Sequence, residues 1–136
     1  MDEELVRITP DKEKAKSIIK MVETTLSMIE TIDFNKFSSN VTKEYYEVLR
    51  ELITTILLLD GYKTYGEGAH KKLIEYLRVN YRAFTEDELI FLDDLRIVRN
   101  KIAYDGFFVT ADYIDQREER IRKIIEKLKK IVKNKV

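Results

Sequence analysis

Apolar residues recur at intervals of three and four positions along most of this chain, which places their side chains on one face of an α-helix. No stretch alternates apolar and polar residues over more than a few positions, so the sequence predicts no β-strand. The spacing predicts an all-α fold, an up-and-down bundle of four main helices with one short additional helix. The expected helices span about residues 10–32, 41–60, 69–79, 85–103 and 110–132.

Residues that favour helix ends stand at the expected boundaries. Residues 9–11 (Thr-Pro-Asp) predict a helix start with Thr9 as its cap, and residues 85–88 (Thr-Glu-Asp-Glu) predict a capping box. A polar turn at residues 35–40 separates the first two helices, and Gly61 and Gly106 are placed to end the second and fourth. No internal repeat or long linker divides the sequence, so we expect a single domain over residues 1–136.

Composition narrows the class of protein. The chain contains no cysteine, which excludes disulfides, thiolate metal sites and thiol catalysis. Charged residues make up 37% of it, with only four glycines and one proline, which favours helix and is typical of a thermophile. The acidic first ten residues lack an apolar signal segment, and the longest apolar run, residues 56–59, is too short for a bilayer. We therefore expect a cytoplasmic protein without a membrane segment or a cofactor.

Charge is distributed unevenly, although the formal net charge is zero. Residues 117–136 contain nine Lys or Arg and three Glu, so this segment carries +6 and the rest of the chain −6. The favoured interpretation is a solvated last helix whose cations suit the negative C-terminal end of the helix dipole. The alternative is attraction to phosphate groups.

Arg99 places a positive charge on the apolar face of the expected fourth helix. The residues three and four positions away, which share its side of the helix, are Leu95, Arg96, Ile102 and Ala103, so none of them is acidic. Arginine on such a face is rarely left unpaired. Arg99 is therefore expected to meet an acid from elsewhere in the fold, a second copy of the chain, or an anionic ligand.

The segment around Arg99 also carries a family resemblance. The sequence RNKIAYDG at residues 99–106, the earlier stretch at residues 45–77 and the helical order resemble the HEPN domains, the higher-eukaryote and prokaryote nucleotide-binding domains. The likeness spans about residues 10–130. The usual family signature is Arg, a polar residue, three further residues and His; here Arg99 and Asn100 match, and Tyr104 stands where His would be.

The resemblance implies a four-helix bundle that forms a homodimer, with the two arginine motifs meeting across a cleft. In many members of the family this cleft cleaves RNA without a metal. Such proteins often act as toxins whose partner is a small nucleotidyltransferase. Other members have lost the catalytic residues and serve as binding or scaffolding domains.

The chemistry of the matched residues explains why the departure matters. Arg99 can hold phosphate oxygens in pairs through its planar fork, and Asn100 can orient either a phosphate or the arginine. Tyr104 is a poor base because an unperturbed tyrosine has a pKa of about 10. On an unbroken helix Tyr104 would also point about 140° away from Arg99. We expect the two to share a pocket only if the helix ends near Ala103. The candidate catalytic residues are Arg99 and Tyr104.

Two further residues complete the candidate ligand-binding set. His70, the sole histidine, precedes the third apolar stripe and is expected to be a structural hydrogen-bonding residue, with a substitute acid or base as the alternative and no metal site. Arg96 can pair with Asp93 on its own helix or contact a phosphate. The candidate ligand-binding residues are Arg96, Arg99, Asn100, Tyr104 and His70.

Three functions fit this pattern, and the sequence leaves enzyme status open. The first is a dimeric nucleotide- or RNA-binding domain with weak or no ribonuclease activity, paired with a nucleotidyltransferase. The second is a structural or protein-interaction dimer in which an acid of the fold or of the dimer mate neutralises Arg99. The third is an active, metal-independent ribonuclease toxin with an unusual Tyr104.

Overall fold

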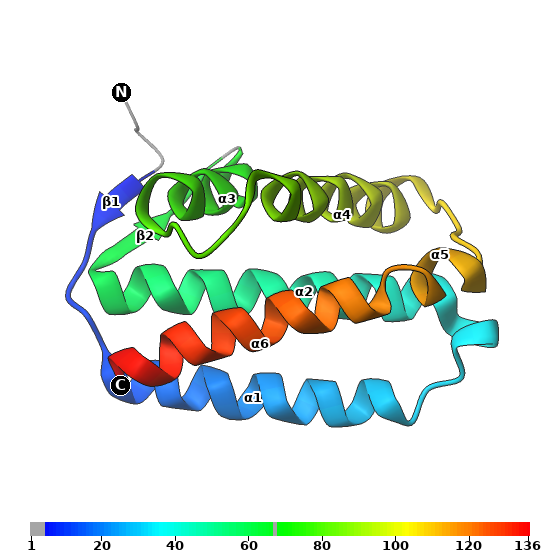
Figure 1. Cartoon of the computed structure of the whole chain (residues 1–136), viewed down its shortest axis with the longest axis horizontal. Helices are drawn as coiled ribbons and strands as arrows, with labels where there is room; N and C mark the ends of the chain where they lie inside the picture. The colour runs from blue at the N-terminus through cyan, green and yellow to red at the C-terminus, as the bar shows by residue number, and fades with distance from the viewer. Residues whose placement is uncertain (1–4, 67) are drawn as a thin grey trace.

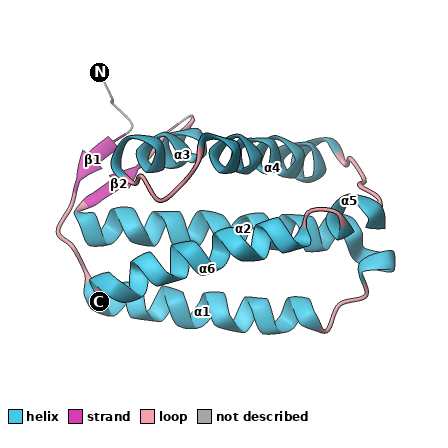
Figure 2. Ribbon diagram, in the orientation of Figure 1, coloured by secondary structure: helices cyan, strands magenta, loops and turns pink. Residues whose placement is uncertain are grey.

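A computed structural model of the chain describes residues 5–66 and 68–136, and within them the fold is an all-α bundle with a two-stranded sheet at one end (Figures 1 and 2). The elements in chain order are β1 (Leu5–Arg7), α1 (Lys12–Glu30), α2 (Phe34–Asp60), β2 (Tyr62–Thr64), α3 (Ala69–Asn80), α4 (Glu86–Asp105), α5 (Ala111–Asp115) and α6 (Glu118–Lys135). The all-α class expected from the apolar spacing is confirmed.

Helix α2 is the central element of the bundle. It packs against α1, α3, α4, α5 and α6, with α1 along one side and α3 and α4 along the opposite side (Figure 1). Its apolar residues are buried on more than one side, as the Leu57 and Leu58 pair illustrates. No helix among the described residues is long and apolar enough to cross a membrane.

Local chemistry at the helix ends agrees with most of the predicted boundaries. Thr85 and Glu88 form the capping box at the start of α4, and Gly61 and Gly106 end α2 and α4 in left-handed conformations, with φ of 92° and 65°. Thr9 was the wrong residue for the first cap. Instead Asp11 accepts a hydrogen bond from the Lys14 amide at 2.9 Å, and α1 begins after it.

Two predicted boundaries are wrong. The turn expected at residues 35–40 lies inside α2, which begins at Phe34 with Asp33 as its cap and has a kink at Phe37. The last helix is not continuous from Thr110, because α5 ends at Asp115 and α6 begins at Glu118. In both places the sequence lacks the glycine or proline that normally marks an interruption, so the apolar spacing alone could not locate it.

The prediction that the chain contains no strand is also wrong. Strands β1 and β2 pair antiparallel, with Leu5 opposite Thr64 and Arg7 opposite Tyr62. Each strand is three residues long, too short for an alternating pattern to be visible in the sequence. The sheet ties the start of the chain to the connection between α2 and α3.

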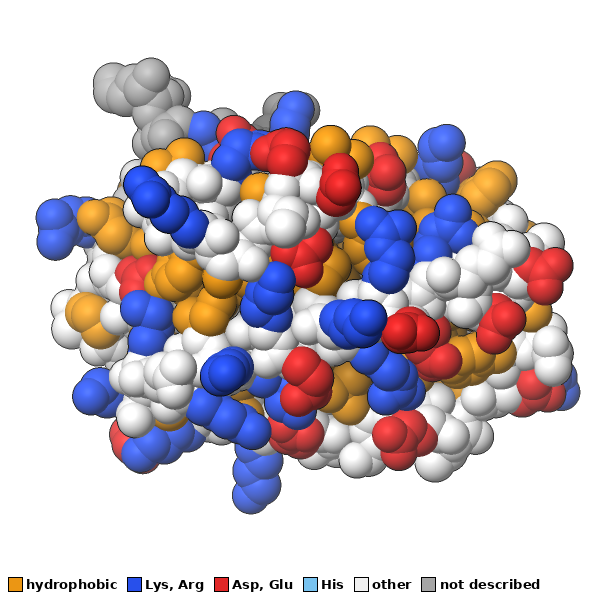
Figure 3. All heavy atoms as spheres, in the orientation of Figure 1, with side chains coloured by type: hydrophobic (Ala, Val, Ile, Leu, Met, Phe, Trp, Pro, Cys, Tyr) orange, Lys and Arg blue, Asp and Glu red, His pale blue; other side chains and the backbone are white. Residues whose placement is uncertain are grey.

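The cations of the last helix are mostly engaged in ion pairs. Lys127 pairs with Glu88 at 2.9 Å, Lys129 with Glu23 at 2.8 Å, and Lys123 with Glu119 at 3.2 Å. Basic and acidic side chains are accordingly interspersed over the face that carries α6 (Figure 3). The pairing favours the solvated-helix interpretation of the positive segment over attraction to phosphate.

Asp60, the last residue of α2, joins three elements at the end of the bundle. Its Oδ2 accepts hydrogen bonds from the hydroxyls of Tyr76 and Tyr81 at 2.7 and 2.6 Å, and its Oδ1 lies 2.7 Å from Nζ of Lys135. Burial raises the pKa of Asp60, but hydrogen bonds from Lys135, Tyr81 and Tyr76 outweigh burial, so the pKa lies below its usual range. The carboxylate therefore contributes to stability in its charged form.

We predict that Asp60→Asn lowers the free energy of unfolding by about 1–3 kcal/mol at neutral pH, because hydrogen bonds to a partly buried charge are lost. A folded-state pKa below the unfolded value of about 3.9 contributes stability above that pH, and the contribution is lost as pH falls through the folded pKa. The difference between variant and wild type should therefore shrink below about pH 4. Urea denaturation at several pH values measures both effects.

Asp115→Asn is the matched control, since Asp115 is exposed at the end of α5. We expect it to change stability by less than about 0.5 kcal/mol. Equal losses in the two variants would show that the Asp60 network has no stabilising role.

Candidate functional site: an arginine and histidine cluster

Arg99 on α4 meets an acid from α2. Its Nη2 lies 2.9 Å from Oε1 of Glu47, and the two side chains are 16% and 25% exposed. Of the three sources that the sequence allowed for a negative partner, the described chain supplies the first, an acid from elsewhere in the same fold. The ion pair joins the middle of α2 to the second half of α4.

Glu47 is shared between two arginines. Its Oε2 accepts hydrogen bonds from Nε and Nη2 of Arg50 at 3.0 and 2.8 Å, and its Oε1 faces Arg99. One carboxylate therefore lies between two guanidinium groups that are each largely removed from solvent. Glu47 alone cannot neutralise both guanidinium groups, and Glu51 lies within electrostatic range of Arg50.

The guanidinium of Arg99 keeps hydrogen-bonding capacity that its contacts do not use. Its Nη1 donates to Oδ1 of Asn100 at 3.1 Å, and its Cζ lies 6.0 Å from the ring centroid of Tyr46. Its Nε is buried and has no hydrogen-bond partner among the described residues. The contact with Glu47 is an ion pair without hydrogen-bond alignment. Asn100 thus orients the arginine, one of the two roles expected for it.

Arg96 has the local partner that its sequence position predicts. Its Nε donates to Oδ1 of Asp93 at 2.8 Å, and its side chain is 18% exposed. Arg96 lies one turn before Arg99 on α4, so three arginines from two helices gather here against two carboxylates.

An open hollow of about 460 Å³, here called the α3/α4 hollow, lies between the start of α3 and the second half of α4. Four of the five predicted ligand-binding residues, His70, Arg96, Asn100 and Tyr104, line it, while Arg99 lies behind them against Glu47. Lys71 adds a second cation, and no acidic side chain lines the hollow within the described residues.

The start of α3 forms the other wall of the hollow. Gly66 and Gly68 line it, and Gly68 caps α3 with a φ of 81° and without a side-chain hydrogen bond. A glycine allows this left-handed turn and leaves the first amide groups of the helix without a capping side chain. These amides add to the positive potential of the cations across the hollow.

Helix α4 ends at Asp105, two residues after Ala103, and the ring centroid of Tyr104 lies 5.8 Å from Cζ of Arg99. Two long side chains bridge the angular separation that their Cα positions impose. The apolar face of α4 also ends early, because Leu92 and Leu95 are buried whereas Ala103 is exposed. Arg99 therefore stands where α4 passes from the core to the surface.

His70 lies in a positive environment. The pKa of His70 lies below the ordinary 6.5. Burial of the ring is the largest cause, and the nearby positive charges of Arg50 and Arg99 lower the pKa further. The ring is therefore largely neutral at pH 7. Its centroid lies 6.4 Å from that of Tyr46, and burial raises the pKa of Tyr46 to about 12.

Sequence reasoning missed the α2 contribution to this cluster, which is Tyr46, Glu47 and Arg50. The three-residue spacing of Glu47 and Arg50 is visible in the sequence as a local ion pair. Nothing in the sequence places that pair beside Arg99, because the contact depends on how α2 and α4 cross. The assembled cluster can bind an anion, hold it by charge-assisted hydrogen bonds, and offer it a neutral imidazole.

Comparison of the chain with protein-family models, with curated proteins and with solved structures finds no match. Among residues 5–66 and 68–136, no group of three or more His, Asp or Glu side chains is arranged to hold a metal ion.

We predict that Glu47→Gln lowers the free energy of unfolding by about 1–3 kcal/mol, because it leaves Arg50 and Arg99 facing each other without their shared charge. Glu13→Gln is the matched control, since Glu13 forms an exposed ion pair with Lys16, three residues further along α1. We expect that control to cost less than about 0.5 kcal/mol. Thermal and urea unfolding measure both, and losses of equal size would remove the structural role assigned to the Glu47 bridge.

We also predict that the single histidine titrates with a midpoint below 6.5 and that Arg50→Met moves the midpoint upward. With one histidine in the chain, its imidazole resonances in an NMR titration are unambiguous. Arg82→Met removes an exposed arginine from the connection between α3 and α4 and should leave the midpoint unchanged. A wild-type midpoint at or above 6.5 would contradict the electrostatic description of this cluster.

Proposed function

We propose that this chain is a HEPN-like, dimeric domain that binds RNA or nucleotide phosphate at the α3/α4 hollow, with weak or no ribonuclease activity. The observation that carries the proposal is the convergence of Arg96, Asn100 and Tyr104 from α4 with His70 from α3 on one hollow. These residues lie apart in the sequence, and the hollow that they share has cations and no acid in its described lining. Such a lining suits a phosphodiester backbone.

The side chains available for proton transfer favour binding of RNA over its cleavage. Metal-free cleavage of RNA needs one group to accept the 2′-hydroxyl proton and another to protonate the leaving oxygen. The neutral imidazole of His70 suits the first role, because its lowered pKa keeps the ring unprotonated at pH 7. Tyr104, exposed at the rim, is the candidate for the second role, and its hydroxyl is a weak acid. We therefore favour an RNA-binding domain over an active ribonuclease toxin.

The structural alternative is favoured by a specific observation. Glu47 already neutralises part of the charge of Arg99, which is what an arginine retained for fold or interface specificity requires. The two functions are compatible in one molecule, because Arg99 lies behind the hollow while Arg96 and His70 line it. In this arrangement Arg99 supports the site and Arg96 makes the first contact with phosphate.

The proposed dimer surface adjoins the hollow. Tyr104 near the end of α4, and Phe107 and Phe108 just after it, are exposed, as is Ile97, which lies between Arg96 and Arg99 in sequence. Apolar side chains gathered at one place mark a surface suited to contact with another protein. A homodimer through this surface would bring two arginine motifs together, and a nucleotidyltransferase is the second partner that we propose.

We predict that single-stranded RNA binds the wild-type protein and that Arg96→Ala weakens binding about tenfold at moderate salt, because one phosphate contact is lost. Lys130→Ala is the matched control, since Lys130 is exposed on α6, away from the hollow, and carries the same charge. Fluorescence anisotropy measures affinity, and a gel of the same samples measures cleavage.

Equal loss of affinity in Arg96→Ala and Lys130→Ala would show that binding is not located at the hollow. Absence of RNA binding in the wild type would favour the structural alternative. Complete cleavage of the RNA by the wild type, abolished in His70→Ala, would replace the proposal with the ribonuclease.

A further inference from the structure

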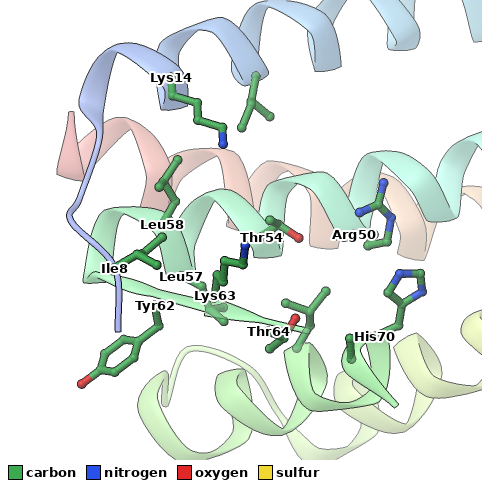
Figure 4. A pocket seen from close by; sticks show the side chains of 13 residues that line it. Ile8, Lys14, Arg50, Thr54, Leu57, Leu58, Tyr62, Lys63, Thr64 and His70 are labelled. Atoms are coloured by element: carbon green, nitrogen blue, oxygen red, sulfur yellow. The ribbon is translucent and has the colours of Figure 1, made fainter. Parts of the chain in front are cut away.

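A second cavity, of about 280 Å³, lies between α1, α2, β2 and α3 (Figure 4). It is called the lysine pocket here, after Lys14 of α1 and Lys63 of β2, whose amino groups point into the same space (Figure 4). The candidate functional site makes no use of either lysine. The lysine pocket shares Ala69 and His70 with the hollow and is otherwise lined by different residues.

The walls of the lysine pocket are apolar and its rim is cationic. Ile8, Ile18, Leu57, Leu58 and Tyr62 supply the apolar surface. Both lysines are exposed at the rim, and neither amino group has an ion pair or hydrogen bond among the described residues. No acidic side chain belongs to the described lining of the pocket. Thr54 and Thr64 also line the pocket (Figure 4).

We propose that the lysine pocket binds a small amphipathic anion, with its apolar body against α2 and its carboxylate between Lys14 and Lys63. An apolar cavity with a few convergent polar groups is the usual form of a small-molecule site. The size of the ligand follows from the volume, since about 280 Å³ at about 30 Å³ per water-sized group holds about nine or ten non-hydrogen atoms. A medium-chain carboxylate has this size and combines an apolar chain with a charged end.

The two lysines at the rim of the pocket indicate a negatively charged ligand. Two unpaired ammonium groups that converge on one space repel each other, and a carboxylate between them relieves the repulsion while it gains charge-assisted hydrogen bonds. A neutral ligand of the same shape would gain only from the apolar wall. The proposed carboxylate contacts differ from those proposed for RNA, because neither lysine lines the hollow, and Arg50, the third cation of the lysine pocket, is already bonded to Glu47.

Isothermal titration with octanoate tests the inference. We expect a Kd below about 1 mM for the wild-type protein, and binding of octan-1-ol about tenfold weaker. The double variant Lys14→Met and Lys63→Met should bind octanoate about tenfold more weakly than the wild type. The double variant Lys12→Met and Lys20→Met is the matched control, because it removes two exposed lysines of α1 outside the pocket.

A variant whose new side chain fills the pocket tests the proposal independently. Thr54→Phe places a ring in the cavity and should abolish binding of octanoate and octan-1-ol alike, with a melting curve to verify folding. Three outcomes would overturn the proposal: no binding of octanoate by the wild type, equal affinities for octanoate and octan-1-ol, or equal losses in the two lysine double variants. Failure of the octanoate test would leave the RNA measurement unaffected, so the two proposals fail separately.

Discussion

The carboxylate of Glu47 stands on the helix that the other helices surround, and it is the charge that allows two arginines to be held inside this fold. Oxygen Oε2 binds Arg50 on the same helix, and Oε1 faces Arg99 on α4. Without it, Arg99 would have no ion-pair partner among the described residues, and Arg50 would lose the carboxylate that it hydrogen-bonds. The crossing of α2 and α4 is therefore fixed by charge as well as by apolar packing. The same bridge places the cationic residues of α4 beside the start of α3.

Positive charge has different consequences in two parts of the molecule. The last helix carries the larger surplus in the sequence, yet Lys127, Lys129 and Lys135 each meet an acid from another helix. The α3/α4 hollow has fewer cations, Arg96 and Lys71, and although Arg96 pairs with Asp93 on its own helix, no acid belongs to the described lining. Local pairing, rather than the charge of a segment, decides where an anion is attracted.

The sequence predicted those features that depend on neighbours along the chain. The capping box of Thr85 and Glu88 and the helix end at Gly61 follow from chemistry within one turn, and both are confirmed. The need of Arg99 for a negative partner from outside its own helix could also be derived, because that helix supplies none. The identity of that acid could not, since Glu47 reaches it only through the packing of α2 on α4. The sheet was missed for a similar reason, because its strands are short and far apart in sequence.

His70 connects the two cavities, because it forms part of the wall of each. Burial lowers the pKa of His70, and the positive charges of Arg50 and Arg99 lower it further. An anion bound in either cavity would offset those positive charges and favour the protonated ring.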